Sequence, residues 1–294
     1  NELNFTASGE MDNGFTWSYS MELDPASGGA ANNDDTSIVI GMGDMGTVKV
    51  CVSECGNNKK YAFDASAYTK MSDTGISEGI IYPGDAGAAG TATIQYHTPE
   101  LPFGTTASIA YNTQVAGDAA SGNTTGQTTT AQNSREEYSL VTKPLDGLTL
   151  SAHYNKVNDY ADGVATEDQL EEGGAYGAKY SAGNLTVGYG KSFQAPELLS
   201  SSATGASVEY YENTGFSIGY AVNDELSVSY TRETSEANQA HSSNTTYDIE
   251  MDSVQFAYSL GGATLSVARA DYENVGYAQN ADATETIVAM TFAF

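Results

Sequence analysis

Thr286-Ile287-Val288-Ala289-Met290-Thr291-Phe292-Ala293-Phe294 has the pattern of a strand with two different faces. From Val288 onward its even-numbered positions are large and apolar, whereas its odd-numbered positions are small or mildly polar. Successive side chains of a strand point to opposite faces, so this segment presents one oily face and one wettable face. Such alternation suits a strand with hydrocarbon on one side and water on the other. In a soluble sheet, an unpaired strand of this kind would invite aggregation.

The same alternation recurs along the whole chain. In the stretch 15–23 every odd-numbered residue is large and apolar and every even-numbered residue is polar. A slip of one residue would exchange the two faces, so the register of such strands is well specified. Fifteen strands are expected, over residues 2–11, 15–24, 36–43, 47–53, 91–99, 105–113, 135–143, 148–157, 174–182, 184–192, 207–222, 225–234, 248–260, 263–273 and 285–294.

Short and long connections alternate strictly between these strands. The short ones hold Gly, Asn, Asp and Pro, the residues of tight hairpins, as in Asp12-Asn13-Gly14. The long ones lie at about 25–34, 54–90, 114–134, 158–172, 194–204, 236–247 and 274–284. Outer-membrane barrels have short turns at one end and long loops at the other, whereas sandwiches and propellers do not sort their loops. The pattern predicts an all-β protein: one transmembrane antiparallel up-and-down β-barrel domain over residues 1–294.

Strand parity adds one expectation about the barrel. An odd number of strands is unusual in a bacterial single-chain barrel. Because the turn at 12–14 falls on the short-turn side, one upward strand should precede residues 2–11. We therefore expect a first strand upstream of Asn1 and sixteen strands in the full protein; a miscount, such as two strands fused in 207–222, is the alternative.

Composition agrees with this architecture and excludes other classes. The 294 residues have 20 Tyr and 31 Gly, and no run approaches the roughly 20 apolar residues of a transmembrane helix. On composition alone, a soluble β-sandwich or β-solenoid would fit equally well. The net charge of −27 argues against nucleic-acid binding, which needs a basic face.

Cys51 and Cys55 are the only cysteines. Two cysteines at this spacing suit a small disulfide in an oxidising compartment, with two free thiols as the alternative. A metal site would need further ligands nearby. Acidic stretches at 32–35 and 167–172 could hold Ca²⁺ through loop oxygens, or could simply be solvated charge.

The chain shows no catalytic constellation. Its three histidines, at positions 97, 153 and 241, fall on different segments, and no nucleophile elbow or phosphate-binding loop is present. We therefore expect that the protein is not an enzyme and needs no cofactor.

The stretches 5–16 (FTASGEMDNGFT) and 43–50 (GDMGTVKV), together with the terminal Phe294, resemble the trimeric general diffusion porins of Gram-negative outer membranes, especially the alphaproteobacterial type. The resemblance implies a sixteen-stranded, water-filled barrel whose third external loop narrows the pore. It also implies a homotrimer in the outer membrane that passes ions and small hydrophilic solutes by passive diffusion. The cysteine pair is not typical of that family.

The connection 54–90 takes the place of the constricting third loop. Its carboxylates and the inward-facing cations of the wall would create a transverse field across the narrowest point; solvated or structurally paired charges are the alternative. The loop residues are Glu54, Asp64, Asp73, Glu78 and Asp85, and the wall residues are Lys49, Arg135, Lys143 and Lys179. The acidic excess predicts a modest preference for cations.

Four basic residues fall on the outward side of upward strands, just beyond the apolar stretch: Lys156, Lys191, Arg232 and Arg269. At the interface such charges cost little, so they predict a cationic ring that binds lipopolysaccharide phosphates. Snorkelling or burial at a trimer contact are the alternatives.

A substrate-specific channel, or an adhesin or receptor barrel that binds through its long loops, is the competing functional interpretation. A sugar channel would carry aromatic residues along its lumen, whereas most aromatic residues here lie on the lipid-facing side of the predicted strands.

Overall fold

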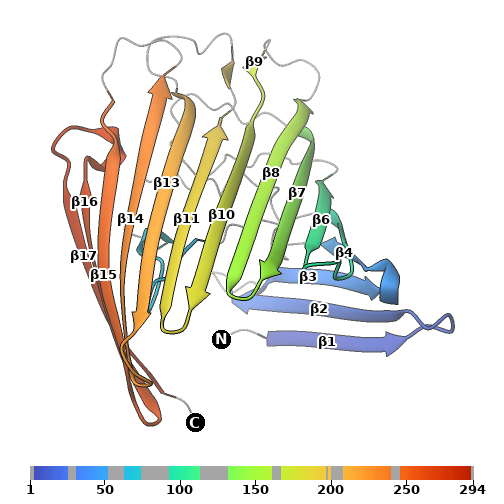
Figure 1. Ribbon diagram of the computed structural model, residues 1–294. Coiled ribbons are helices and arrows are strands. Elements are labelled where there is room, and N and C mark those ends of the chain that lie inside the picture. Colours follow the sequence, from blue (N-terminus) through green and yellow to red (C-terminus); the bar gives the residue numbers. More distant parts are fainter. Residues whose placement is uncertain are drawn as a thin grey trace.

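The computed structural model describes residues 3–25, 31–51, 63–73, 93–112, 132–160, 167–196, 198–199, 208–239 and 246–292. Strands dominate these residues (Figure 1). The strands of the main sheet are β1 (Leu3–Glu10), β2 (Thr16–Pro25), β3 (Ala31–Gly41), β4 (Thr47–Cys51), β5 (Thr93–His97), β6 (Thr106–Asn112), β7 (Gln132–Leu145), β8 (Leu148–Tyr160), β10 (Glu172–Ala182), β11 (Leu185–Ala195), β13 (Val208–Ala221), β14 (Leu226–Gln239), β15 (Ile249–Leu260), β16 (Ala263–Glu273) and β17 (Ala283–Phe292). In the described ranges, no helix is both long and apolar enough to cross a membrane.

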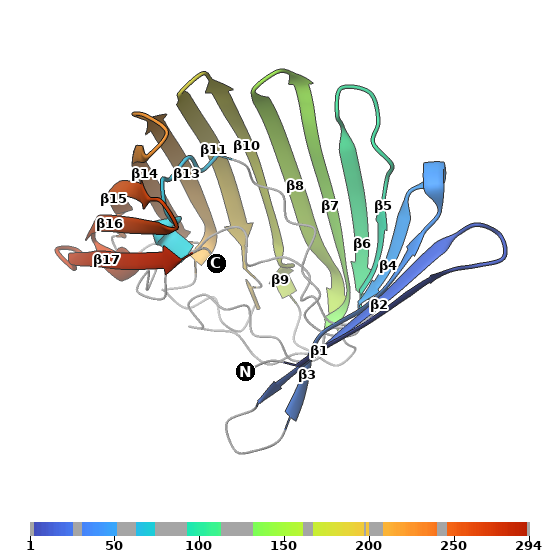
Figure 2. The same ribbon diagram turned by 90° about the horizontal axis from the view of Figure 1, so that it is seen from below.

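The main sheet has 15 strands, and its spatial order follows the chain from β1 to β17. Each strand pairs antiparallel with the next, as in Phe5 opposite Met21 and Val267 opposite Val288. Seen from below, the strands follow an arc with β1 and β17 at its two ends (Figure 2). The predicted up-and-down antiparallel fold is confirmed. The additional strand expected before Asn1 lies outside this sequence and stays a prediction.

Several strands continue beyond the predicted boundaries at the long-loop end. β7 begins at Gln132 and β14 continues to Gln239, so parts of the expected loops belong to the sheet. Two predicted loops also contain strands, because β9 (Glu167–Gln169) pairs with β12 (Leu198–Leu199) in a separate two-stranded sheet. Among the described residues, short 3₁₀ turns lie at η1 (Gly43–Met45), η2 (Met71–Asp73) and η4 (Val275–Tyr277). Each of these short elements has only two or three residues, too few for an alternation of faces to reveal it.

The turn between β7 and β8 shows why the short connections need glycine. Gly147 has a φ of +79°, which disfavours a side chain. A Cβ atom there would also lie 2.1 Å from the carbonyl oxygen of Ser181 on the neighbouring hairpin. Glycine therefore allows adjacent hairpins to pack closely at this end of the sheet.

Polarity across the sheet is the reverse of that in a soluble protein. On β8, Ser151, His153 and Asn155 are at most 5% exposed, whereas Leu150 on the opposite face is 36% exposed. On β13, Ser217 is fully buried and Phe216 is 44% exposed. Buried positions of soluble domains are mostly apolar, so a polar inner face and an apolar outer face indicate a sheet with lipid outside.

The inner face also carries an apolar cluster near its long-loop end. The cluster joins strands β13 to β16 with η2 and η4. Its buried members are Met71, Tyr211, Ala237, Ile249, Met251, Ala268, Ala270, Tyr272 and Tyr277. Inside the curved sheet this cluster packs like a small protein core and fixes the segments that it contacts.

Candidate pore constriction

Residues 63–73 belong to the predicted third loop and lie on the inner face of the sheet. The backbone N–H of Ala65 donates to Ser217 Oγ on β13 at 2.9 Å, and that of Ala67 donates to Ser229 Oγ on β14 at 2.8 Å. Figure 2 shows this part of the chain inside the arc, beside the strands of its C-terminal half. The described part of the loop therefore lies across the inner wall.

Glycines on β11 and β13 leave room for the start of this segment to pack directly against the sheet. A Cβ atom at Gly188 would lie 1.6 Å from the carbonyl oxygen of Phe63, and one at Gly219 would lie 2.4 Å from that of Ala65. At Gly215, a Cβ atom would meet the Phe63 ring at 2.5 Å. Glycine at inward positions of adjacent strands is a sequence signal for such close approach, so these three residues could have been assigned to the site from the sequence.

Gln255 on β15 clamps the middle of the segment. Its Oε1 accepts hydrogen bonds from the N–H groups of Tyr68 and Thr69, both at 3.1 Å. Its Nε2 donates to the carbonyl oxygen of Thr69 at 2.7 Å. Because Gln255 is only 2% exposed, these bonds form away from water, where an unmade bond is costly.

The far end of the segment is fixed to β14 and β16. Met71 packs in the apolar cluster, and its carbonyl oxygen accepts a hydrogen bond from the Tyr272 hydroxyl at 3.1 Å. Next to it, Ser72 Oγ donates to Glu233 Oε1 at 2.7 Å. The segment is therefore anchored along its length by groups that come from several strands.

Of the predicted loop carboxylates, Asp64 is described in full. Its Oδ1 accepts hydrogen bonds from the N–H and the hydroxyl of Ser66, at 3.2 and 2.7 Å. Asp73 ends η2, but its side chain lies outside the described residues, as do Glu54, Glu78 and Asp85.

The predicted wall cations divide into three groups. Lys179 on β10 reaches the segment, because its Nζ donates to the carbonyl oxygen of Asp64 at 3.4 Å. Arg135 on β7 is buried and forms an ion pair with Glu171 at 3.2 Å. Lys143 is exposed at the short-turn end of β7, and Lys49 lies half-buried on β4. The structure thus brings Lys179 to the described part of the loop and places Arg135 and Lys143 elsewhere.

Lys70 is a further cation of the segment. Its Nζ lies 5.7 Å from the centre of the Phe63 ring, within the range of a cation–π interaction. Nothing in the local sequence predicts that the Lys70 side chain runs back toward Phe63.

Cys51, the last residue of β4, is disulfide-bonded and 1% exposed. Its predicted partner, Cys55, lies outside the described residues, so the pairing itself stays a prediction. The Nε2 of Gln95 on β5 donates to Cys51 Sγ at 3.4 Å. The bond therefore lies where the chain leaves β4 for the third loop.

The four outward basic residues each lie beside carboxylates, so they do not form a purely cationic ring. Three of them reach an acid on a neighbouring strand, and Arg269 reaches one on its own strand. The pairs are Lys156 with Glu136 at 3.6 Å, Lys191 with Glu212 at 2.6 Å, Arg232 with Asp252 at 3.3 Å and also with Glu250, and Arg269 with Asp271 at 2.9 Å. All these side chains are partly exposed, so water and salt screen each pair and it contributes little to stability.

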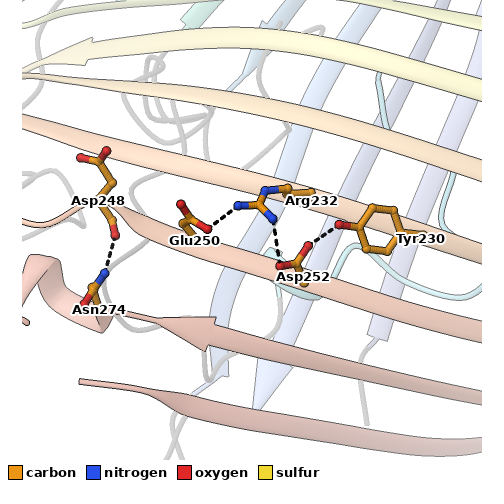
Figure 3. A network of polar contacts seen from close by, with 6 residues as sticks. All are labelled: Tyr230, Arg232, Asp248, Glu250, Asp252 and Asn274. Atoms are coloured by element: carbon orange, nitrogen blue, oxygen red, sulfur yellow. Dashed lines mark hydrogen bonds and ion pairs between the residues drawn. The ribbon is translucent and has the colours of Figure 1, made fainter. Parts of the chain in front are cut away.

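Figure 3 shows the densest part of this outward charged belt. Arg232 lies between Glu250 and Asp252, and the Tyr230 hydroxyl donates to Asp252. In the strand register, Asp252 faces Asp271 on β16. Like charges directly opposite each other destabilise a sheet, so Arg232 and Arg269 offset a repulsion that would otherwise remain.

Across the described ranges, no group of three or more His, Cys, Asp or Glu side chains is placed to hold a metal ion. The two described histidines contact amides on their own strands: His97 Nε2 lies 3.0 Å from Gln95 Oε1, and His153 Nε2 lies 3.1 Å from Asn155 Nδ2. Most side chains of the two stretches proposed for Ca²⁺ lie outside the described residues, so that assignment stays a prediction.

One long antiparallel sheet, polar inside and apolar outside, with a loop segment fixed to its inner wall, defines the fold of the porin class of channel barrels. Solved structures agree. The chain superposes on the anion-selective porin from Comamonas acidovorans with a TM-score of 0.66 at 14% identity, covering 100% of this chain and 89% of that one. For Salmonella typhi OmpF in complex with daunomycin, the TM-score is 0.63 at 14% identity, with coverages of 99% and 89%. For the outer-membrane channel DcaP of Acinetobacter baumannii, it is 0.64 at 10% identity, with coverages of 98% and 83%.

No protein-family model matches the sequence, and no curated protein matches it either. At identities of 10 to 14%, the structural likeness establishes the porin fold alone.

Proposed function

We propose that this chain is a porin of the Gram-negative outer membrane that lets ions and small hydrophilic solutes diffuse passively through its lumen. The observation that carries the proposal is the reversed polarity of the sheet, with Ser217 buried inside and Phe216 exposed outside. Such a sheet is stable where hydrocarbon covers its outer face and water reaches its inner face. The alphaproteobacterial type belongs to the proposal as well.

A planar-bilayer recording tests this function directly. The purified protein should produce discrete current steps at low voltage in simple salt solutions. Protein that stays soluble without detergent and leaves the bilayer current unchanged would overturn the proposal.

The proposal includes a modest preference for cations. The net charge of −27 raises the local cation concentration at the mouths, and the loop carboxylates Asp64, Asp73 and Glu78 would extend this field to the constriction. When these three carboxylates are neutralised, the reversal potential in asymmetric salt should shift toward the equilibrium potential of chloride. An unchanged reversal potential would remove them from the selectivity filter.

We also include a homotrimer, supported by a difference between two parts of the outer surface. The exposed outward positions of β1, β5 and β6, such as Phe5, Ile94 and Ile109, are apolar, whereas β7 to β16 carry the outward charged belt. An apolar outer patch without ionic rows suits contact with another subunit. Current closures in three equal steps, together with a trimer mass in native mass spectrometry, would support this state.

Lipopolysaccharide is the proposed lipid partner of the outward charged belt. Its phosphates would compete with the carboxylates for Lys156, Lys191, Arg232 and Arg269, with Arg able to form two hydrogen bonds. The double variant Arg232→Gln and Arg269→Gln should co-purify with less lipopolysaccharide than the wild type. Equal amounts would count against direct contact.

A channel or receptor that binds through its long loops is the alternative function. The pairing of β9 with β12 favours it, because two long connections are ordered against each other. In addition, Gln169 Nε2 donates to the carbonyl oxygens of Pro196 and Glu209 at 2.7 and 2.8 Å. Liposome swelling with solutes of graded size separates the two functions, since a general pore gives rates that fall smoothly with size.

A further inference from the structure

The connection between β16 and β17, residues 274–282, is attached to the inner face of the sheet. Tyr277 is its anchor, because the side chain is 8% exposed and belongs to the apolar cluster. Its ring centre lies 5.5 Å from that of Tyr211 on β13, and its hydroxyl shares a 2.7 Å hydrogen bond with Ser235 Oγ on β14. A buried aromatic ring whose hydroxyl has a partner is a strong point of attachment. The connection is therefore fixed to the wall, although its positions 278–280 are exposed.

The backbone of this connection is shaped so that Tyr277 reaches the cluster. Asn274 and Tyr277 both have positive φ, +55° and +59°. Asn tolerates this conformation, whereas for a bulky aromatic residue it is a costly exception. The Val275 N–H donates to the Ala281 carbonyl oxygen at 2.7 Å, and Asn274 Nδ2 donates to that of Asp248 at 3.0 Å (Figure 3). Such an exception persists only where its surroundings fix it, and it is a reason to look for a role of the buried ring.

The same strand holds both this connection and residues 63–73 of the third loop, the constriction segment. On β14, Ser235 bonds to the Tyr277 hydroxyl. Glu233, the preceding residue on the same face, accepts the hydrogen bond from Ser72 Oγ at 2.7 Å. Successive side chains on one face of a strand are close neighbours. The connection and the end of the constriction segment are thus attached side by side.

Met251 on β15 joins the two attachments. It is fully buried in the apolar cluster, and the strand register places it opposite Glu233 on one side and Tyr272 on the other. Tyr272 in turn donates to the carbonyl oxygen of Met71 at 3.1 Å. Close-packed interiors transmit displacements from one side chain to the next. A movement of Tyr277 should therefore affect Met71.

We infer that Tyr277 is a positioning residue of the constriction, which holds the constriction segment against the inner wall through the apolar cluster. This inference rests on the proposed channel function and deepens it, because it assigns control of the constriction to a second connection at the long-loop end. Release of Tyr277 from the cluster would loosen the Met71 end of the segment. A change in an exposed connection would thereby reach the pore.

Hydrogen exchange of the folded, detergent-solubilised chain tests this coupling without requiring a channel. Tyr277→Asn removes the ring and introduces a residue that tolerates positive φ. It should accelerate amide exchange in residues 63–73 about tenfold, as expected for side chains coupled through packing. Tyr277→Phe keeps the ring and loses only the bond to Ser235, so it should retain most of the protection.

Val157→Ala is the matched control, since it removes buried apolar atoms from β8, outside the cluster. It should leave exchange in residues 63–73 unchanged. Heat-shifted electrophoretic mobility verifies that each variant is folded. If Tyr277→Asn does not fold, Tyr277→Leu, which keeps apolar bulk, takes its place and should accelerate exchange severalfold.

Exchange in residues 63–73 that matches the wild type in the folded variant would overturn the inference. This holds even if residues 274–282 exchange faster, because Tyr277 would then act only on its own connection.

Single-channel recording separates this inference from the proposed function. Wild-type protein without current steps would refute the channel function, whatever the exchange shows. Normal current steps together with unchanged exchange in the Tyr277 variants would refute the positioning role alone. In a conducting protein, Tyr277→Asn should give stronger open-channel noise than the wild type, while Val157→Ala should not.

Discussion

Replacing Gln255 with Met should release the middle of the constriction segment. The two side chains have similar volume, but Met cannot replace the bonds to the N–H groups of Tyr68 and Thr69 or to the Thr69 carbonyl. Each buried backbone group left without its partner costs about 1–3 kcal/mol. Because the backbone groups of a detached segment can bond to water instead, we expect the substitution to destabilise the attached state by about 2–4 kcal/mol relative to the detached state.

In the proposed channel, such a loss should change the conductance. At 1.4 kcal/mol for each factor of ten, the equilibrium between detached and attached segment should shift by roughly 30- to 1000-fold. The assay is single-channel recording, in which Gln255→Met should show larger unitary current and stronger open-channel noise than the wild type. Limited proteolysis within residues 63–73 should accelerate in parallel.

The matched control is Gln194→Met, since Gln194 is another buried inward glutamine, on β11. It should destabilise the barrel modestly and leave noise and proteolysis of the segment unchanged. If Gln255→Met conducts as quietly as the wild type while folded, the segment is not held by this clamp, and the reasoning fails.

Three further outcomes are expected. Gly188→Ala would place a Cβ atom 1.6 Å from the Phe63 carbonyl oxygen, so the segment must move and the unitary current should rise. The rise should be smaller in Gly219→Ala, where the Cβ atom would lie 2.4 Å from the Ala65 carbonyl oxygen, and equal currents in both variants would contradict the close-packing argument. Cys51→Ser opens a very short loop and should lower the free energy of unfolding by roughly 2 kcal/mol, measured by urea titration of refolded protein. Under reducing conditions the wild type should lose the same stabilisation, so the difference between wild type and variant should disappear. Arg232→Gln leaves the carboxylates of Asp252 on β15 and Asp271 on β16 facing each other without this arginine, so it should lower the unfolding temperature of the barrel in dilute salt. About 1 M NaCl should largely remove the effect, and a loss that persists in high salt would point to packing instead of charge.

The sheet was predictable because each strand carries its own signal. Alternation in stretches such as 15–23 fixes which side chains face outward, and turn residues fix where hairpins reverse. Only the long-loop ends were misplaced. There β7 and β14 continue through polar residues, since neighbouring strands supply hydrogen-bond partners that no local pattern reveals.

The site was predictable only in outline. The position of the third loop follows from the order of turns, but its contacts depend on residues far away in the chain. Tyr68 bonds to Gln255 across 187 positions, and Met71 bonds to Tyr272 across 201. Inward parity marks Gln255 and Tyr272 as lumen residues, yet nothing in the sequence says which part of the loop they meet. The same limit explains why Lys179 reaches the segment while Lys143 does not.

These distant partners have a consequence for biogenesis. The groups that hold residues 65–72 belong to β13 through β16, which are synthesised after most of the other strands. Before β13 to β16 join the sheet, the third loop has no groups to bind, so the constriction should form among the last steps of barrel assembly. If the assembly machinery releases the barrel only after the last hairpins are in place, it also prevents the release of a barrel without its constriction.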